Sequence, residues 1–261
     1  MKPLVSVVIT TYNSASSVER VLKSIFNQSY ENIEILIFDD ASTDNTKNII
    51  EKVLTNKNFR SEYFFSKKNN GGPAKGRNWG IVNSRGKYIC FCDADDEWLP
   101  EKLKIQLDFL ENNNFAFCGT RCNVIGSKQY PEFSGPVSIK SQLRRNKFSL
   151  STLMVKSECV KDNIMFDERI EYHAVEDFDL ILKLYSLGYI GFVINSKLVN
   201  YYYSLTSLSH LNLKKSELKR ILILRNFKCN NIFIMVYVKS IILLLKTRLK
   251  SYGVRNYFSK L

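Results

Sequence analysis

The sequence reads Lys87-Tyr88-Ile89-Cys90-Phe91-Cys92-Asp93-Ala94-Asp95-Asp96 at the point that decides its fold. Residues 87–92 are mostly aromatic and apolar, a composition that predicts a short buried β-strand. The acids Asp93, Asp95 and Asp96 therefore follow the C-terminal end of that strand. Open α/β sheets bind their ligands at this end of their strands, so the stretch predicts both a sheet and the edge that carries a binding site.

The three carboxylates of this stretch are close enough to repel one another, and each would raise the pKa of its neighbours. A divalent cation removes that conflict. Hard oxygen ligands suit Mg²⁺ or Mn²⁺, which usually complete their coordination shell with substrate phosphates. The alternative is a solvated acidic turn before the helix that Pro100 opens.

The residues on either side of this stretch alternate between strand and helix patterns. Strands are predicted at 5–11, 33–38, 63–66 and 87–92. Helices are predicted from 18 to 26, after Asp44, at 77–83 and at 100–112. Residues 16–19 have the form of a capping box at the start of the first helix. The alternation predicts a Rossmann-like α/β fold with a mainly parallel central sheet flanked by helices, and one cleft at the shared strand ends.

The alternation weakens after about residue 113. Strands are predicted at 115–125, 150–155, 189–194 and 198–203, and a loop at 126–136. A helix is predicted at 176–187, with Gly188 as its C-cap. We expect one domain at 1–210, made of two parts at 1–112 and 113–210. A basic helical extension is expected at 211–261.

The chain is strongly basic, with 38 Lys and Arg against 25 Asp and Glu and a net charge of +13 over 261 residues. Such an excess predicts an anionic partner. About a dozen of the basic residues lie between Lys214 and the end of the chain, where Glu217 is the only acid, so the charge predicts a surface-binding tail.

The six cysteines show no zinc-type CxxC pair, and we interpret them as reduced thiols of a reducing compartment. The N-terminal residues do not have the pattern of a signal peptide, and no apolar run reaches the length of a spanning helix. These features predict a cytoplasmic protein.

Five motifs in order resemble those of the inverting nucleotide-sugar glycosyltransferases of family 2, which have the GT-A fold. The resemblance runs from Val5 to about Tyr203. It implies a catalytic domain at 1–210, with a nucleotide-binding half at 1–112 and an acceptor half at 113–210. Each motif is weak alone, but five at successive strand ends are specific. The motifs are Val7-Val8-Ile9-Thr10-Thr11-Tyr12-Asn13, Asp39-Asp40-Ala41-Ser42-Thr43-Asp44, Asn70-Gly71-Gly72-Pro73-Ala74-Lys75-Gly76-Arg77-Asn78, Asp93-Ala94-Asp95-Asp96 and Glu176-Asp177-Phe178-Asp179-Leu180.

The resemblance implies that Thr10, Tyr12 and Asp40 hold the nucleoside of the donor. Tyr12 would stack on the base, and Asp40 would accept a hydrogen bond from the N3–H of uracil, which makes a UDP-sugar the expected donor. The alternative is that Asp40, Ser42 and Asp44 only cap the next helix.

The same resemblance places Arg77 and Asn78 beside the donor, where Arg77 would pair with Asp93 or with a phosphate. Asp93 would contact the ribose or the donor sugar. Asp95 would be the principal ligand of Mn²⁺ or Mg²⁺, and Asp96 would help to orient the metal or the sugar. The cation would stabilise the charge that develops on the departing nucleoside diphosphate.

Asp177 matches the catalytic base of the family, at the predicted N-terminus of a helix that favours the ionised carboxylate. Attack opposite the diphosphate would invert the anomeric centre and convert an α-linked donor into a β-linkage. Glu176, His173 and Trp98 are candidates for the acceptor side. As an alternative, Glu176 and Asp177 only add negative charge to the first turn of the helix. For Trp98 the alternative is a side chain that lines the core.

Some positions depart from the family pattern. Lys183 stands where many relatives have Arg, so any bidentate contact there is lost. Residues 201–204 lack an Arg or His that many relatives carry near the diphosphate, and Ser207, Ser209 or His210 would have to substitute.

The apolar run 232–245, with Lys239, Lys246 and Lys250 on one helical stripe, predicts an interfacial amphipathic helix on an anionic leaflet. The alternative is a helix packed on the catalytic domain. A membrane surface suits a polyprenyl-diphosphate-linked acceptor, so we expect a protein peripheral to the inner face of the cytoplasmic membrane that builds O-antigen, capsule or lipopolysaccharide.

Two other functions fit parts of the sequence. A sugar nucleotidyltransferase shares the strand-helix-acid pattern but normally needs a basic Gly-rich N-terminal loop. Here the first strand ends in Thr-Thr-Tyr-Asn at residues 10–13, which contain neither Gly nor a basic residue. A nucleic-acid binder would interleave its basic residues with exposed aromatic side chains, whereas these stand beside Leu and Ile in the tail. We therefore expect no nucleic-acid partner.

Overall fold

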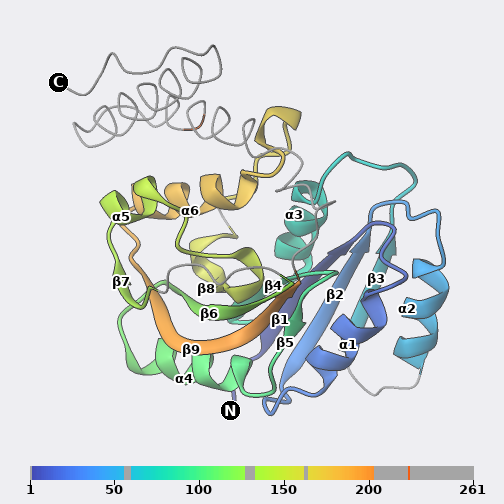
Figure 1. The fold of residues 1–261 in the computed structure, drawn as a ribbon, viewed down its shortest axis with the longest axis horizontal. Coiled ribbons are helices and arrows are strands. Elements are labelled where there is room, and N and C mark those ends of the chain that lie inside the picture. Colours follow the sequence, from blue (N-terminus) through green and yellow to red (C-terminus); the bar gives the residue numbers. More distant parts are fainter. Residues whose placement is uncertain (1, 56–59, 127–132, 162–163, 203–222, 224–261) are drawn as a thin grey trace.

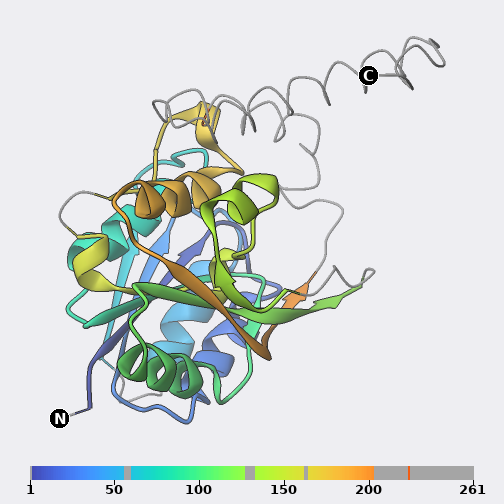
Figure 2. The same cartoon turned by 90° about the vertical axis from the view of Figure 1, so that its left-hand side faces the viewer.

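A computed structural model shows the fold of the chain (Figure 1). It describes residues 2–55, 60–126, 133–161, 164–202 and 223. Within these residues one twisted sheet runs through the molecule and helices lie on both of its faces (Figures 1 and 2). This confirms the predicted α/β class with a central, mostly parallel sheet.

The first half of the sheet consists of four parallel strands in the order β3-β2-β1-β4. Its strands are β1 (Val5–Thr11), β2 (Ile33–Asp39), β3 (Arg60–Phe65) and β4 (Tyr88–Asp93), and its helices are α1 (Val18–Phe26), α2 (Thr46–Thr55) and α3 (Ala74–Asn83). Strands β1, β2 and β4 are buried along almost their whole length, which explains why they read as continuous apolar runs.

The second half continues the sheet in the order β8-β6-β9-β5, with β7 paired to β9. Its elements are β5 (Glu97–Trp98), α4 (Lys102–Asn112), β6 (Phe117–Ile125), β7 (Gly135–Val137), α5 (Ile139–Arg144), β8 (Met154–Lys156), α6 (Glu176–Ser186) and β9 (Gly191–Tyr202). Strand β8 joins the halves because it lies antiparallel between β4 and β6. Three short 3-10 helices, at 150–152, 157–159 and 170–172, complete the described elements.

The core has two layers, one on each face of the sheet. Helices α1, α2 and α4 cover one face, where Ile25, Ile50 and Leu107 belong to one cluster with alternate residues of β1 and β2. Helices α3 and α6 cover the other face, where Ile81 and Leu184 belong to the second cluster. Figure 1 shows α6 above and α4 below strands β6 and β9.

The first half matches the sequence prediction closely, and the second half differs from it. Residues 150–155 were predicted as one strand but form a 3-10 helix followed by β8. Residues 189–194 and 198–203 were predicted as two strands but form the single strand β9. The short elements β5, β7 and α5 were not predicted, because two to six residues are too few to show a periodicity.

The predicted capping box at α1 is wrong. Ser17 occupies the N-cap position but makes no side-chain cap hydrogen bond. Its hydroxyl instead donates to the carbonyl oxygen of Ala94, 2.6 Å away, in the acidic loop after β4. The C-cap of α6 is Leu187, one residue before the predicted Gly188. Gly188 follows it with φ +84°, the conformation that glycine adopts without strain just after a helix.

The predicted tail at 211–261 and the residues Ser207, Ser209 and His210 lie outside the described residues, apart from Ile223. The side chain of Ile223 is buried against α5 and α6, in a cluster with Leu143 and Phe178. Among the residues that the structure describes, no helix is both long and apolar enough to cross a membrane. The proposed division into a catalytic domain and a basic tail stays a prediction.

Candidate functional site

The C-terminal ends of β1, β2 and β4 meet at one edge of the sheet. Thr10 lies opposite Phe38 of β2 on one side and opposite Asp93 of β4 on the other. Tyr12 and Asp40 follow directly after β1 and β2. Parallel pairing therefore brings four of the predicted donor-side residues to one edge, as expected for an open α/β sheet.

The two residues expected to bind the nucleoside differ in how exposed their side chains are. Tyr12 is 49% exposed, so its ring is open to a stacking partner, whereas Asp40 is only 6% exposed. The carboxylate of Asp40 accepts hydrogen bonds from the backbone N–H of Asn70, 3.0 Å away, and from its side-chain amide. Asp40 thus ties the end of β2 to the loop before α3. Asp44 has a structural place, because it accepts from the backbone N–H groups of Thr46 and Ala15.

Backbone strain is concentrated beside the predicted site residues. Among the described residues, the non-glycine residues with positive φ are Asn13, Ala41 and Ala174, at +47°, +62° and +69°. They directly follow Tyr12, Asp40 and His173. Such conformations persist only where the surrounding structure enforces them, and they cluster at functional sites.

The acidic loop after β4 is held by α1 through two main-chain carbonyls. Ser17 binds the carbonyl of Ala94, and Nη2 of Arg20 donates to the carbonyl of Asp95 at 2.7 Å. The guanidinium of Arg20 also stacks 3.7 Å above the ring of Tyr202 at the end of β9. These contacts fix the loop backbone and leave the carboxylates of Asp95 and Asp93 for other partners.

Asp95 and Asp96 have different surroundings. Asp95 is exposed, while Asp96 is 1% exposed and neither of its carboxylate oxygens has a hydrogen-bond partner. Burial, and then the charges of Asp93 and Asp95, raise the pKa of Asp96 well above its usual range. An unpartnered buried carboxylate beside an exposed one is a donor set that fits a hard divalent cation.

The described residues contain no group of three or more His, Cys, Asp or Glu side chains arranged to hold a metal ion. A cation at Asp95 and Asp96 would therefore need further oxygen ligands from elsewhere. Mg²⁺ and related ions usually take these from water and substrate phosphates.

Arg77 is a buried bridge between the two halves of the molecule. Its Nη2 lies 2.7 Å from Oδ1 of Asp93, and its Nη1 lies 2.6 Å from Oε1 of Glu176. Arg77 and Glu176 are each 5% exposed. The ion pairs connect α3, the end of β4 and the start of α6, so the guanidinium is occupied by protein carboxylates.

Asp177 follows Glu176 in the first turn of α6. Its Oδ2 accepts a hydrogen bond from Nδ2 of Asn146 at 2.9 Å, and its Oδ1 accepts from the N–H of Phe178. Burial, and then the negative charge of Glu176, raise the pKa of Asp177 to about 7. A carboxylate with a pKa near neutrality is suited to accept a proton in a reaction at physiological pH.

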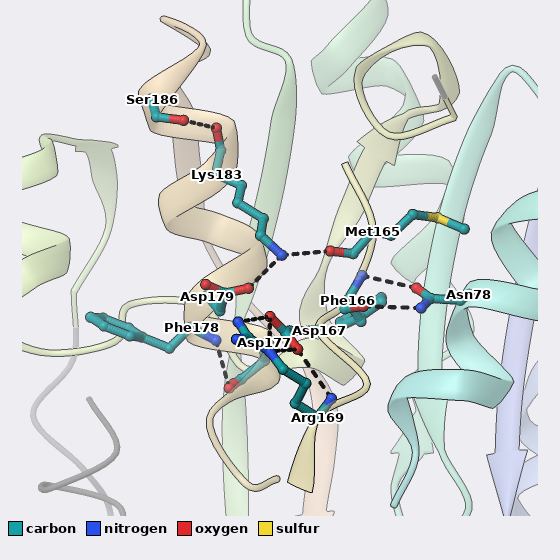
Figure 3. Close-up of polar contacts among 10 residues, drawn as sticks. All are labelled: Asn78, Met165, Phe166, Asp167, Arg169, Asp177, Phe178, Asp179, Lys183 and Ser186. Atoms are coloured by element: carbon teal, nitrogen blue, oxygen red, sulfur yellow. Dashed lines mark hydrogen bonds and ion pairs between the residues drawn. The ribbon is translucent and has the colours of Figure 1, made fainter. Parts of the chain in front are cut away.

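The side chain of Asn78 is bound to the segment before α6. Its side-chain amide accepts from the N–H of Phe166 at 2.8 Å and donates to the carbonyl of the same residue at 3.0 Å. It also donates to Glu168. Figure 3 shows this amide holding the segment before α6 against α3. Both functional groups of the amide are thus engaged within the protein, and the role of Asn78 in binding the donor stays a prediction.

Lys183 holds the other side of that segment. Its Nζ lies 2.6 Å from Oδ2 of Asp179 and donates to the carbonyl of Met165 at 2.9 Å (Figure 3). Both contacts are single-point contacts that an ammonium can make, so Lys serves here without the bidentate geometry of Arg. Asp179 therefore stabilises the first turns of α6.

The three acceptor-side candidates occupy different places. Trp98 is 2% exposed and stacks on the Nζ of Lys102, 3.8 Å from its ring centre, so the core-lining alternative is correct. Glu176 is engaged by Arg77 and is not open to an acceptor. His173 is half-buried and lies against the loop at Gly71 and Gly72.

Sequence reasoning did not find Arg20, Asn70 as a partner of Asp40, or Asn146. Arg20 looks like any exposed helical Arg, and Asn146 lies in a stretch without periodicity. Each acts through a contact between residues 30 or more positions apart, which no local pattern reveals.

Comparison with known families adds to this geometry. The family model described as Glycosyl transferase family 2 matches residues 6–162, more than half of the chain. An uncharacterised glycosyltransferase of Rickettsia conorii is 37% identical over 194 residues, which cover 72% of this chain and 31% of the relative. The chain thus spans about a third of that relative's length.

A second relative has a more specific name. The UDP-Glc:alpha-D-GlcNAc-diphosphoundecaprenol beta-1,3-glucosyltransferase WfaP of Escherichia coli is 33% identical over 205 residues, which cover 77% of this chain and 76% of the relative.

Solved structures share the fold at low sequence identity. TarS of S. aureus in complex with UDP-GlcNAc has a TM-score of 0.71 and 20% identity, over 94% of this chain and 72% of that one. A mannosyltransferase of Pyrobaculum calidifontis in complex with GDP-Man and Mn²⁺ has a TM-score of 0.68 and 16% identity, over 98% of this chain and 77% of that one. The fold is therefore GT-A. With the motif order, the strand-end geometry and the family match in agreement, the chain belongs to glycosyl transferase family 2.

Proposed function

We propose that the protein is an inverting glycosyltransferase that moves a sugar from UDP to a hydroxyl group of a lipid-linked glycan. The observation that carries the proposal is the Arg77 bridge. It links Asp93, at the donor edge, to Glu176. Glu176 is the neighbour of Asp177, the proposed general base. A single ion network thereby connects the predicted donor side to the predicted base.

Asp177 acts as the general base in this proposal. Its ionised carboxylate takes the proton of the acceptor hydroxyl as the hydroxyl oxygen attacks C1 of the sugar. The bond from C1 to the diphosphate breaks at the same time, and the electron pair leaves with the nucleoside diphosphate. Attack from the face opposite the leaving group inverts C1, so an α-linked donor gives a β-linked product.

Asp95 and Asp96 would hold Mn²⁺ or Mg²⁺. When bound, such a cation stabilises the negative charge on the departing diphosphate. The unpartnered buried carboxylate of Asp96 and the exposed one of Asp95 support this assignment. The protein contributes the fixed loop backbone, which Ser17 and Arg20 hold through main-chain carbonyls.

UDP is the proposed nucleotide for two reasons. Tyr12 offers an open ring beside Asp40, and an ionised carboxylate has enough acceptor sites to bind Asn70 and a uracil N3–H together. The name of WfaP includes UDP-Glc, and a TarS structure contains UDP-GlcNAc. Both facts concern those proteins and support a UDP-sugar here.

The proposed acceptor is a polyprenyl-diphosphate-linked glycan of a bacterial surface polysaccharide such as O-antigen, capsule or lipopolysaccharide. WfaP is named for a diphosphoundecaprenol acceptor. A lipid-linked acceptor would place the protein at the inner face of the cytoplasmic membrane, where the basic C-terminal residues would meet anionic lipid.

The test is nucleoside-diphosphate release by the purified full chain from UDP-, GDP- and dTDP-sugars. It is run with and without Mn²⁺ and with a diphosphate-lipid-linked monosaccharide as acceptor. Metal-dependent UDP release from one sugar is the expected result. Release of pyrophosphate from UTP and a sugar phosphate would instead show that the protein is a sugar nucleotidyltransferase.

Two variants test the assigned residues. Asp177→Asn keeps the size of the side chain and removes the base, so transfer should fall by about 100-fold or more while the fold is retained. Asp95→Ala should abolish the response to Mn²⁺. Near-wild-type transfer by Asp177→Asn would disprove the base assignment, and proton NMR of the product would show whether the new linkage is β.

A further inference from the structure

We infer that His173 is a positioning residue that holds the donor-side loop and the base-bearing segment in register, through packing of its ring on Gly72. The inference rests on the proposed function. It assigns His173 to the catalytic geometry through a contact within the protein, whereas the sequence suggested a contact with the acceptor.

The ring of His173 lies where a side chain at residue 72 would begin. A Cβ atom built at Gly72 would be 3.0 Å from both Cε1 and Nε2 of the ring. Carbon atoms pack at about 3.5–4.0 Å, so the ring occupies the space of a side chain at this position. Gly71, with φ +82°, would place a Cβ 3.3 Å from the same ring.

The glycine at position 72 makes room for this contact, and the backbone conformation of residue 72 does not itself require a glycine. Its φ lies outside the left-handed region, unlike that of Gly71, so an alanine at 72 would not strain the main chain. A methyl group at 72 would therefore meet the His173 ring, which would have to shift to admit it.

The contact joins two segments that carry the proposed chemistry. Gly72 precedes α3, which bears Arg77, while His173 stands four residues before Asp177. Ala174, between His173 and α6, has φ +69°, a strained conformation that the surroundings must hold. The ring contact and the Arg77–Glu176 ion pair thus fasten the same two segments at two points.

A loss of the ring should therefore displace the base relative to the donor and leave donor binding nearly intact. Misplacement of reacting groups by about 1 Å can cost up to about 100-fold in rate. The expected signature of His173→Ala is a fall in kcat of about tenfold or more, with an affinity for UDP that changes less than about twofold.

The experiment is a double-mutant cycle on the full chain with Gly72→Ala, His173→Ala and the combined variant. Thermal unfolding, UDP affinity by calorimetry and transfer rate are measured for each. Gly72→Ala should lower both Tm and kcat because its methyl group meets the ring. The added His173→Ala should relieve that clash and restore most of the Tm, while kcat should stay near that of His173→Ala because the positioning ring is absent. A double variant whose Tm is no higher than that of Gly72→Ala would overturn the contact.

His173→Phe is the matched control, because it keeps a flat ring and removes the ring nitrogens. It should retain most of the wild-type kcat and Tm. A loss of kcat at unchanged Tm would show that the ring nitrogens contribute beyond packing and would overturn a role through packing alone. Equal losses of kcat and UDP affinity in His173→Ala would also overturn the proposed positioning role, which predicts a loss of kcat with UDP affinity nearly unchanged.

The cycle also separates this inference from the proposed function. A wild-type chain that is inactive toward every sugar nucleotide would disprove the function. The Tm values would still decide the contact, since rescue of stability does not depend on activity.

Discussion

At the scale of single residues, the pKa of Asp177 governs the proposed reaction. Burial and the charge of Glu176 raise it to about 7, while Arg77 opposes that rise and Asp93 adds to it. The base is active only when ionised. We therefore expect kcat/KM to be highest above about pH 7 and to fall as the pH drops through that value, measured as a pH–rate profile.

Glu176→Gln provides the control for this pH dependence. Removal of a negative charge beside Asp177 should lower the pKa of the base, so the acid limb of the profile should move to lower pH. Asn146→Ala removes a neutral hydrogen-bond donor to the ionised carboxylate and should move the limb the opposite way. A profile that neither variant shifts would mean that another group sets the limb.

Arg77 is the residue on which the link between the halves depends most. Removal of one partner from a buried ion pair typically costs about 3–5 kcal/mol, because the remaining charge is left uncompensated. Arg77→Ala should therefore lower the free energy of unfolding by about that amount, measured by urea denaturation.

Arg169→Ala is the matched control for this loss. Arg169 also pairs with a carboxylate, that of Asp167, at 2.7 Å, but its own side chain is 62% exposed. Exposed pairs contribute little to stability, so this variant should unfold at nearly the same urea concentration as the wild type. Similar losses in both variants would contradict the assigned importance of burial.

At the scale of elements, the packing of α3 on β1 depends on glycine. A Cβ at Gly80 would lie 2.2 Å from Cγ1 of Val8, well inside contact distance. An alanine normally stabilises a helix interior by about 1 kcal/mol relative to glycine. Here Gly80→Ala should destabilise the protein by about 1–3 kcal/mol through overpacking, a reversal of sign that denaturant unfolding can detect.

Val82→Ala is the control on the same helix. Val82 is 67% exposed, so its replacement changes helix propensity without touching the sheet and should leave stability almost unchanged. Recovery of the Gly80→Ala variant by Val8→Ala would locate the clash. A Gly80→Ala protein as stable as the wild type would show that α3 can move away from β1 at no cost.

At the scale of the whole molecule, ligand binding should couple to folding. A ligand that binds only the folded state raises its stability, by about 2.7 kcal/mol at a hundred times Kd. UDP with Mn²⁺ should therefore raise Tm, GDP should raise it less, and Asp95→Ala should remove the part that depends on Mn²⁺. A larger shift with GDP would contradict the UDP assignment.

The sequence predicted the first half of the fold well because its strands are continuous apolar runs that end in polar motifs. Strands β1 and β2 and helix α3 lie where those patterns indicated. The second half was predicted less well. Short elements such as β5 and α5 have no measurable period, and their places are set by pairing with β9 and packing on α6.

The sequence by itself determined the α/β class, the family and the set of acids that gather at the strand ends, because periodicity and motif order are local properties of a chain. The tertiary structure alone decided what those side chains do for one another. It showed that Arg77 is held by Asp93 and Glu176, that Asn78 holds the backbone before α6, and that Trp98 is core. These roles depend on contacts between residues far apart in sequence, and such contacts exist only once the sheet has brought both halves together.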